Sequence, residues 1–171
     1  MGDEVGAMDD TLASLGALVI YMQMSERLIG AVLRHVLPDS SAKTMDQLAG
    51  EITVYRKATL GALIKAVKQR IEIRDDFAEV LEAFLTDRNA LIHDVTRITG
   101  FDLNTEQGRA VANSFLANLT ENAEAVTKVF LALWVENMEE TGRALGMDPE
   151  LVEYLGDYGG IAGQVFFKRD D

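Results

Sequence analysis

Apolar residues recur every three or four positions along most of this chain, which is the pattern of helices that bury one face. The pattern breaks at Pro38 and Gly100, and both residue types disfavour helix interiors. Alternating runs typical of strands are few. We therefore predict an all-α fold, a single domain over residues 1–171 arranged as an up-and-down bundle of four to five main helices. The predicted helices cover residues 10–37, 59–70, 75–99 and 105–140, with short helices starting near Thr44 and Asp148 and with flexible or loosely packed ends at 1–9 and 160–171.

Two of the predicted apolar stripes carry a charged residue at the centre. Arg88 lies among the apolar positions of residues 75–99, and Glu26 lies in the same way among those of residues 10–37. A charged side chain on a core face is costly unless it is paired or faces a polar cleft. If the two helices are adjacent, Glu26 and Arg88 can form a buried ion pair. The apolar residues around Arg88 are Phe77, Leu81, Phe84, Leu91, Val95 and Ile98.

The helix predicted over residues 10–37 is apolar on two sides. One side carries the stripe that contains Glu26, and the other side carries a second set of apolar residues. Such a helix is either central to the bundle or shared with a second subunit. We favour the shared arrangement, since few helices remain in the chain to surround it. The second set is Ala13, Ala17, Ile20, Met24, Leu28 and Ala31.

Composition and charge narrow the classes of function. The chain has 171 residues, of which 48% are hydrophobic and 26% charged, as in an ordinary globular domain. It has no cysteine, which excludes disulfides, thiolate metal sites and cysteine nucleophiles. The formal net charge of −12 argues against a general affinity for nucleic acid or for an anionic membrane. The apolar run at 12–22 follows acidic residues and is too short for a membrane span, so we expect a cytoplasmic protein without a membrane partner.

Most familiar metal and cofactor motifs are missing from the sequence. His35 and His93 are the only histidines, so one chain cannot supply a three-histidine metal site. No HExxH, EF-hand, P-loop or paired Glu-x-x-His motif occurs, and we expect neither a metal nor another cofactor. His93 remains as the candidate for chemistry, because Arg88 and Asn89 shortly precede it on the same predicted helix.

A basic segment precedes this part of the chain. Residues 56–74 contain several lysines and arginines but a single acidic residue, in a chain that is otherwise acidic. These side chains either form a solvated helix face that balances acidic neighbours or form a rim that attracts phosphate. In the second case Lys65, Lys68 and Arg70 are the candidate substrate-binding residues.

Residues 88–93, which read RNALIH, resemble the Arg-x4-His motif of HEPN domains, in the form with asparagine after the arginine. Residues 59–64, which read TLGALI, also resemble a segment often seen before that motif. The predicted helix layout over residues 10–140 is similar to that of the family as well. HEPN domains are small all-α bundles of prokaryotic toxin–antitoxin, phage-defence and RNA-processing systems. The resemblance implies metal-independent RNA cleavage by a dimer.

The resemblance also implies a catalytic site made of Arg88, Asn89 and His93, to which we add Glu26 as the expected partner of Arg88. A neutral histidine can take the proton of a ribose 2′-hydroxyl, an arginine can hold the phosphate, and an asparagine can orient either group. The products would be 2′,3′-cyclic phosphate and 5′-hydroxyl ends. Arg88 and His93 differ by about 140° around a straight helix, so we expect a homodimer in which two copies share the cleft.

An alternative interpretation needs no catalysis. The Glu26–Arg88 pair would then be structural, His93 would be an ordinary surface residue, and the protein would be an HEPN-like interaction or regulatory module. The expected partners differ accordingly, since a nuclease binds RNA and a module binds an antitoxin or another protein. A bundle that binds a small molecule is a third interpretation. Among nucleases, the net charge of −12 favours one that cuts a short, specific RNA.

Overall fold

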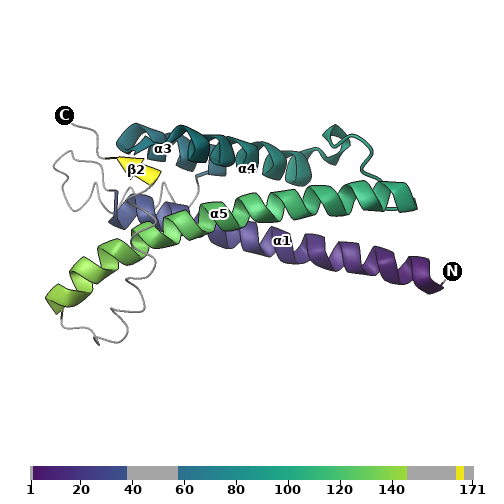
Figure 1. Cartoon of the computed structure of the whole chain (residues 1–171), viewed down its shortest axis with the longest axis horizontal. Helices are drawn as coiled ribbons and strands as arrows, with labels where there is room; N and C mark the ends of the chain where they lie inside the picture. The colour runs from purple at the N-terminus through teal and green to yellow at the C-terminus, as the bar shows by residue number, and fades with distance from the viewer. Residues whose placement is uncertain (1, 38–57, 146–164, 168–171) are drawn as a thin grey trace.

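The computed structural model describes residues 2–37, 58–145 and 165–167, and most of these residues are helical. The all-α prediction is therefore confirmed. The two longest helices lie side by side along the molecule, and the two shorter ones cover one face of that pair (Figure 1). The short helices predicted near Thr44 and Asp148 lie outside the described residues. The elements in chain order are α1 (Gly2–His35), α3 (Leu60–Arg70), β1 (Glu72–Ile73), α4 (Asp75–His93), η1 (Val95–Arg97), α5 (Glu106–Leu145) and β2 (Phe166–Phe167).

Helices α1 and α5 run in the same direction. Thr11 Oγ1 donates to Asn113 Oδ1 at 3.0 Å, and Ser25 Oγ lies 2.6 Å from Thr127 Oγ1, so both hydrogen bonds join residues 102 positions apart. A constant offset of this kind means that the two helices are parallel. These two helices are not consecutive in the chain, and the up-and-down arrangement predicted from the sequence stays a prediction. Helix α4 and the turn after it bring the chain back toward the end of the molecule at which α1 begins, so α4 and α5 run in opposite directions (Figure 1).

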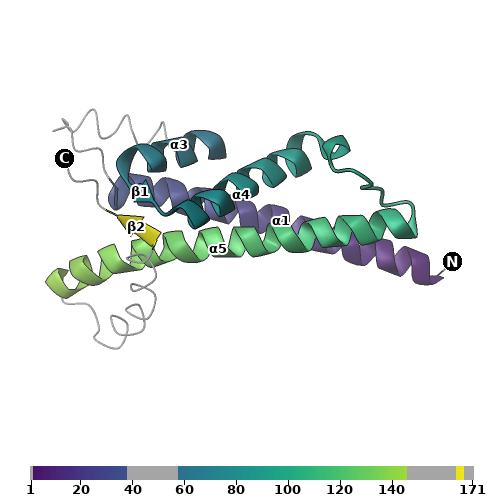
Figure 2. The same ribbon diagram turned by 45° about the horizontal axis from the view of Figure 1, so that its top comes forward.

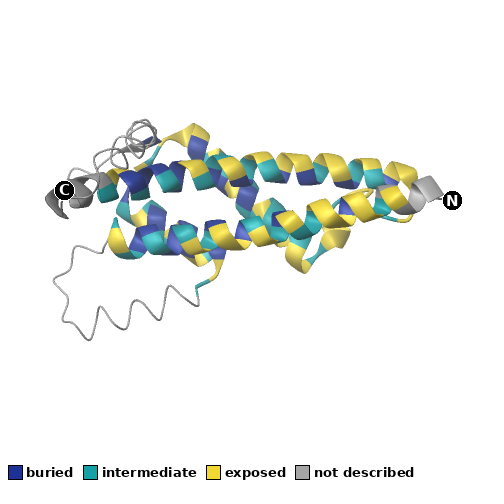
Figure 3. Cartoon of the chain, turned by 90° about the horizontal axis from the view of Figure 1, so that it is seen from below, coloured by how far each residue is buried: buried dark blue, intermediate teal, exposed yellow. Residues whose placement is uncertain are grey.

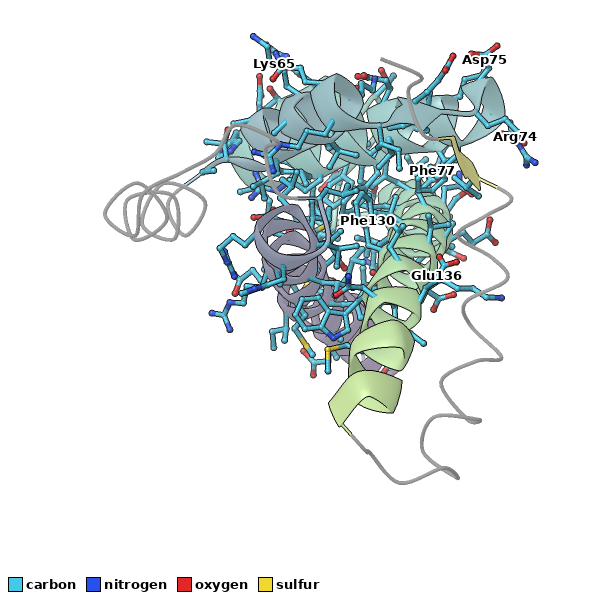
Figure 4. The ribbon with its side chains drawn as sticks, turned by 90° about the vertical axis from the view of Figure 1, so that its left-hand side faces the viewer. Lys65, Arg74, Asp75, Phe77, Phe130 and Glu136 are labelled. Atoms are coloured by element: carbon cyan, nitrogen blue, oxygen red, sulfur yellow. The ribbon has the colours of Figure 1, made fainter. Side chains whose placement is uncertain are left out.

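The core lies where the four main helices meet. Helix α3 packs on α1, and α4 packs on α5. The rings of Phe77 and Phe130 meet between α4 and α5 with their centroids 6.4 Å apart (Figure 4). Exposed and buried positions alternate along the long helices, as the spacing of apolar residues predicts (Figure 3). Fully buried side chains include Met22, Ile29, Leu33, Leu60, Val67, Leu81, Phe84, Leu119 and Val126.

Threonine caps begin α3 and α5 close to the predicted positions. Thr59 Oγ1 accepts a hydrogen bond from the Ala62 backbone N–H at 3.3 Å, and Thr105 Oγ1 accepts one from the Gly108 N–H at 3.0 Å. Glycine is needed at 108 for steric reasons, because a Cβ there would lie 2.1 Å from the backbone oxygen of Asp102. The turn before α5 therefore folds back tightly onto the helix start.

The amino-terminal end differs from the sequence prediction. Helix α1 begins at Gly2 rather than near residue 10, so the end predicted to be loosely packed is helical. By length and composition, Met8–His35 could also cross a membrane, and 33% of its most apolar window is buried. The core helix of a soluble protein meets the same test. Here α1 supplies Met22 and Ile29 to the core.

The carboxyl-terminal end also differs from the prediction at residues 165–167. Strand β2 pairs antiparallel with β1, which places Phe166 opposite Ile73 (Figure 2). Val165 is buried, and its carbonyl accepts the Arg74 N–H at 3.1 Å. The chain therefore returns to the turn between α3 and α4. Strands of two residues are too short to show an alternating pattern, which is why the sequence did not predict them.

Helix α4 ends at His93 and not near residue 99 as predicted. The backbone leaves the helix at Asp94, where φ is −158° and ψ is 73°, and the short turn η1 follows. The Asp94 carboxylate accepts hydrogen bonds from Thr96 Oγ1 and from Arg97 Nε. Such local bonds compete with helix continuation. As a result, His93 is the last residue of α4, and its side chain is exposed.

Candidate functional site

Glu26 of α1 and Arg88 of α4 form an ion pair at the centre of the candidate site. Arg88 Nε donates to Glu26 Oε1 at 2.8 Å, and Arg88 Nη2 lies 2.7 Å from the same oxygen. The arginine side chain is 17% exposed and the glutamate side chain 20% exposed. Each charge stands within the apolar stripe of its helix, so each relieves the cost of burying the other. The pair joins α4 to α1 in a fixed register.

The guanidinium of Arg88 also contacts the two other candidate catalytic residues. Its Nη1 donates to Asn89 Oδ1 at 3.2 Å and lies 3.2 Å from His93 Nε2. An arginine has donors only, so this contact is a hydrogen bond when the imidazole is neutral and carries its proton on Nδ1. Glu26, Arg88, Asn89 and His93 are thus brought together within one chain.

This geometry corrects the expectation that Arg88 and His93 cannot meet within one chain. The angle of about 140° between their positions applies to the helix backbone. The long arginine side chain spans that angle, and His93 occupies the last residue of α4. A shared cleft is therefore not required to unite the two groups.

The cluster borders a groove of about 1230 Å³. The groove lies between the amino end of α3 and the carboxyl end of α4, and Phe115 of α5 contributes an apolar wall. A helix amino end favours an anion, because its first N–H groups lack helical partners. The charges on the wall are mixed: the basic residues are Arg88 and Arg97, the acidic ones are Glu26, Asp87 and Asp94, and His93 stands with them.

The pKa values of the two aspartates in the groove are shifted in opposite directions. Burial raises the pKa of the Asp87 carboxyl. Hydrogen bonds from Thr96 and then from Arg97 lower the pKa of the Asp94 carboxyl. Arg97 Nε lies 2.9 Å from Asp94 Oδ2, so part of the positive charge of Arg97 is balanced. Asp87 is therefore the carboxyl in the groove that takes up a proton more readily than an ordinary aspartate.

The structure does not bring the predicted substrate-binding residues Lys65, Lys68 and Arg70 to the groove. Lys65 points away from the body of the molecule (Figure 4). Lys68 forms an ion pair with Glu82. Arg70 Nη1 donates to the Leu33 carbonyl at 2.8 Å and also to the carbonyl of Leu37, just after the end of α1. The Lys68–Glu82 pair fits the interpretation in which the basic segment balances acidic neighbours, whereas the contacts of Arg70 at the end of α1 were not predicted.

Arg97 is a groove residue that sequence reasoning missed. A helix continued to residue 99 would have placed it on a further turn of the same helix. The early end of α4 instead folds η1 toward the groove. The signal for this was present in the sequence, since aspartate followed by threonine at the second position favours local side-chain bonds that end a helix.

Within the described ranges, no three histidine, aspartate or glutamate side chains are grouped so that they could hold a metal ion. No protein-family model, no curated protein and no solved structure matches this chain. The resemblance to HEPN domains therefore rests on residues 88–93, on residues 59–64 and on the helix layout predicted from the sequence.

Proposed function

We propose that the protein is an HEPN-like, metal-independent endoribonuclease with Arg88, Asn89 and His93 as its catalytic residues. The observation that carries the proposal is the 3.2 Å contact between Arg88 Nη1 and His93 Nε2 at the border of an open groove. It joins a group that can bind a phosphate to a group that can accept a proton. A toxin or phage-defence RNase of the cytoplasm is the role that fits this chemistry.

The chemistry requires His93 to take the proton of a ribose 2′-hydroxyl. The 2′ oxygen then attacks phosphorus, the bond from phosphorus to the 5′ oxygen breaks, and the leaving oxygen takes a proton from the imidazolium or from water. Arg88 stabilises the charge that develops on the phosphate. The products are a 2′,3′-cyclic phosphate and a 5′-hydroxyl.

In the free protein the guanidinium of Arg88 occupies the lone pair that His93 needs for this step. A phosphate competes for the same guanidinium, since arginine binds phosphate with charge-assisted hydrogen bonds. Binding of the substrate would thus release His93 Nε2 at the moment when a base is needed. Glu26 acts as a positioning residue, because it holds two other nitrogens of Arg88.

The charge of the groove favours a short substrate. Its acidic residues repel a long polyanion, whereas Arg88, Arg97 and the amino end of α3 can together engage one or two phosphates. We therefore expect a preference for a short or structured RNA with one phosphate at Arg88, and a cleavage rate that falls only modestly with ionic strength, because few phosphates are engaged.

The test is incubation of the purified protein with total RNA in EDTA, followed by analysis of the new ends. The wild type is expected to cut RNA and leave cyclic phosphates, and His93→Ala and Arg88→Ala are expected to lose at least about 100-fold in rate. His35→Ala is the matched control, since His35 stands at the end of α1 and does not line the groove. Cleavage that survives in His93→Ala would overturn the proposal.

A second candidate function is a non-catalytic HEPN-like interaction or regulatory module. It is favoured by the Glu26–Arg88 pair, which already satisfies the buried arginine without a ligand. Its partner would be a protein such as an antitoxin encoded nearby. This candidate predicts no RNA cleavage by the folded wild type, and co-purification with the product of a neighbouring gene.

A further inference from the structure

Helix α1 has an exposed apolar side that faces away from the core. Ile20 and Met24 are each 62% exposed, and Leu12 is 43% exposed. These are large side chains, and together with Ala13 and Ala17 they form one side of the helix. In the view from below, exposed positions continue along the long helices (Figure 3). Contiguous apolar surface of this kind marks a binding surface more often than chance exposure.

The shape of this side suits a second copy of itself. Toward the amino end it carries Leu12 and the small residues Ala13, Gly16 and Ala17, and toward the carboxyl end it carries the large residues Ile20 and Met24. A Cβ added at Gly16 would meet no atom within 4 Å, so there is open space beside it. In an antiparallel pair of α1 helices that meet at the level of residue 18, Ile20 of each copy faces Gly16 of the other, and Met24 faces Leu12. Large residues set into small ones are the usual basis of close helix packing.

The charges on this side show the same complementarity. Asp9 and Arg27 are both exposed, and neither makes a hydrogen bond or ion pair in the part of the chain that the structure describes. They are separated by five whole helical turns, so they point in the same direction from positions about 27 Å apart along the axis. A twofold axis at the level of residue 18, on the exposed side of the helix, places Asp9 of one copy against Arg27 of the other, and does so twice.

We propose that a second copy of this chain covers the exposed side of α1, in an antiparallel α1–α1 dimer closed by two Asp9–Arg27 ion pairs. This dimer differs from the one expected from the sequence, which was built on the helices that carry Arg88. It leaves the groove of each chain complete. The proposal does not rest on nuclease activity, so either can fail without the other.

The test is the dimer dissociation constant, measured by sedimentation equilibrium on the full chain. Asp9→Arg and Arg27→Asp each create two like-charge contacts, and each is expected to weaken the dimer roughly tenfold at low salt. The double variant Asp9→Arg/Arg27→Asp restores opposite charges, and its dissociation constant is expected to return to within about threefold of the wild-type value. A structural effect of either substitution would not be reversed by the other.

Two further variants complete the test. Ile20→Glu places a charge in the apolar centre of the interface and is expected to give a monomer with unchanged helical circular dichroism. Asn118→Glu adds the same charge to an exposed position of α5 and is expected to remain a dimer. A monomeric wild type, or single charge variants with the same dimer dissociation constant as the wild type, would overturn the proposal. So would a wild type that is monomeric and binds neutral phosphatidylcholine vesicles through Ile20, because α1 would then face a membrane.

Discussion

The Glu26–Arg88 pair is expected to contribute measurably to the stability of the fold. We consider the substitutions Glu26→Gln and Arg88→Met, alone and combined, because each removes a charge while nearly keeping the volume of the side chain. Exposed ion pairs contribute about 0.2–1 kcal/mol, whereas breaking a fully buried pair costs about 3–5 kcal/mol. At 17% and 20% exposure, the side chains of this pair are closer to the buried limit. Arg88→Met should therefore lower the free energy of unfolding by about 2–3 kcal/mol.

The coupling free energy between Glu26 and Arg88, obtained by comparing the double variant with the two single variants, is more informative than either single loss. If the ion pair carries the effect, the double variant should be about 1–3 kcal/mol more stable than the sum of the single losses predicts. Urea unfolding followed by circular dichroism measures all three variants. In thermal unfolding, a loss of 2–3 kcal/mol corresponds to a decrease in Tm of roughly 4–12 °C for a chain of this size.

A matched control is available on the surface of the same protein. The Lys68–Glu82 pair joins α3 to α4 with side chains 36% and 57% exposed, and its coupling should stay below about 1 kcal/mol. If the coupling of Glu26 with Arg88 is no larger than that of the control pair, the reasoning that links burial of this pair to stability is refuted.

Two further predictions concern residues beside the site. Burial raises the pKa of the Asp87 carboxyl, so its ionised form is less favourable in the folded chain than in the unfolded one. Asp87→Asn should therefore raise the free energy of unfolding at pH 7 by a few tenths of a kcal/mol. This gain in stability should vanish as the pH falls through the pKa of Asp87, because the carboxyl is then neutral in both states. A gain that persists at pH 3 would point to another cause. Gly108→Ala should lower the free energy of unfolding by about 1–3 kcal/mol, because the added Cβ would lie 2.1 Å from the Asp102 backbone oxygen. Gly6 has open space around it, so Gly6→Ala should instead raise the free energy of unfolding by about 0.5–1 kcal/mol. Equal effects of the two alanines in thermal unfolding would contradict the steric argument.

The part of the site that depends on helix periodicity was predictable from the sequence. Glu26 and Arg88 stand at the centres of two apolar stripes, and the requirement to pair a buried charge led us to expect their contact if the two helices are adjacent, which the structure shows. Asn89 follows directly, since it is the neighbour of Arg88. The same reasoning could not give the contact with His93, because it depends on the conformation of a long side chain and on where the helix ends.

The parts that failed depend on contacts between distant segments or on local side-chain bonds. The end of α4 at His93 is set by the hydrogen bonds of Asp94, which helix periodicity does not register. The roles of Lys68 and Arg70 are set by Glu82 and by the end of α1, both remote in sequence. The pairing of β1 with β2 joins residues near positions 72 and 167, and no local sequence pattern predicts this pairing.

The pairing of α1 with α5 has a consequence for the synthesis of the protein on the ribosome. Ser25 meets Thr127 across 102 residues, so α1 emerges long before the helix that covers most of its core side. At a synthesis rate of about 5–20 residues per second, that interval is roughly 5–20 s. Throughout it, Met22, Ile29 and Leu33 stay uncovered by α5. During this interval the nascent chain is prone to aggregation, and a chaperone that covers the exposed apolar residues would reduce that risk. Slower translation of α5 would lengthen the interval.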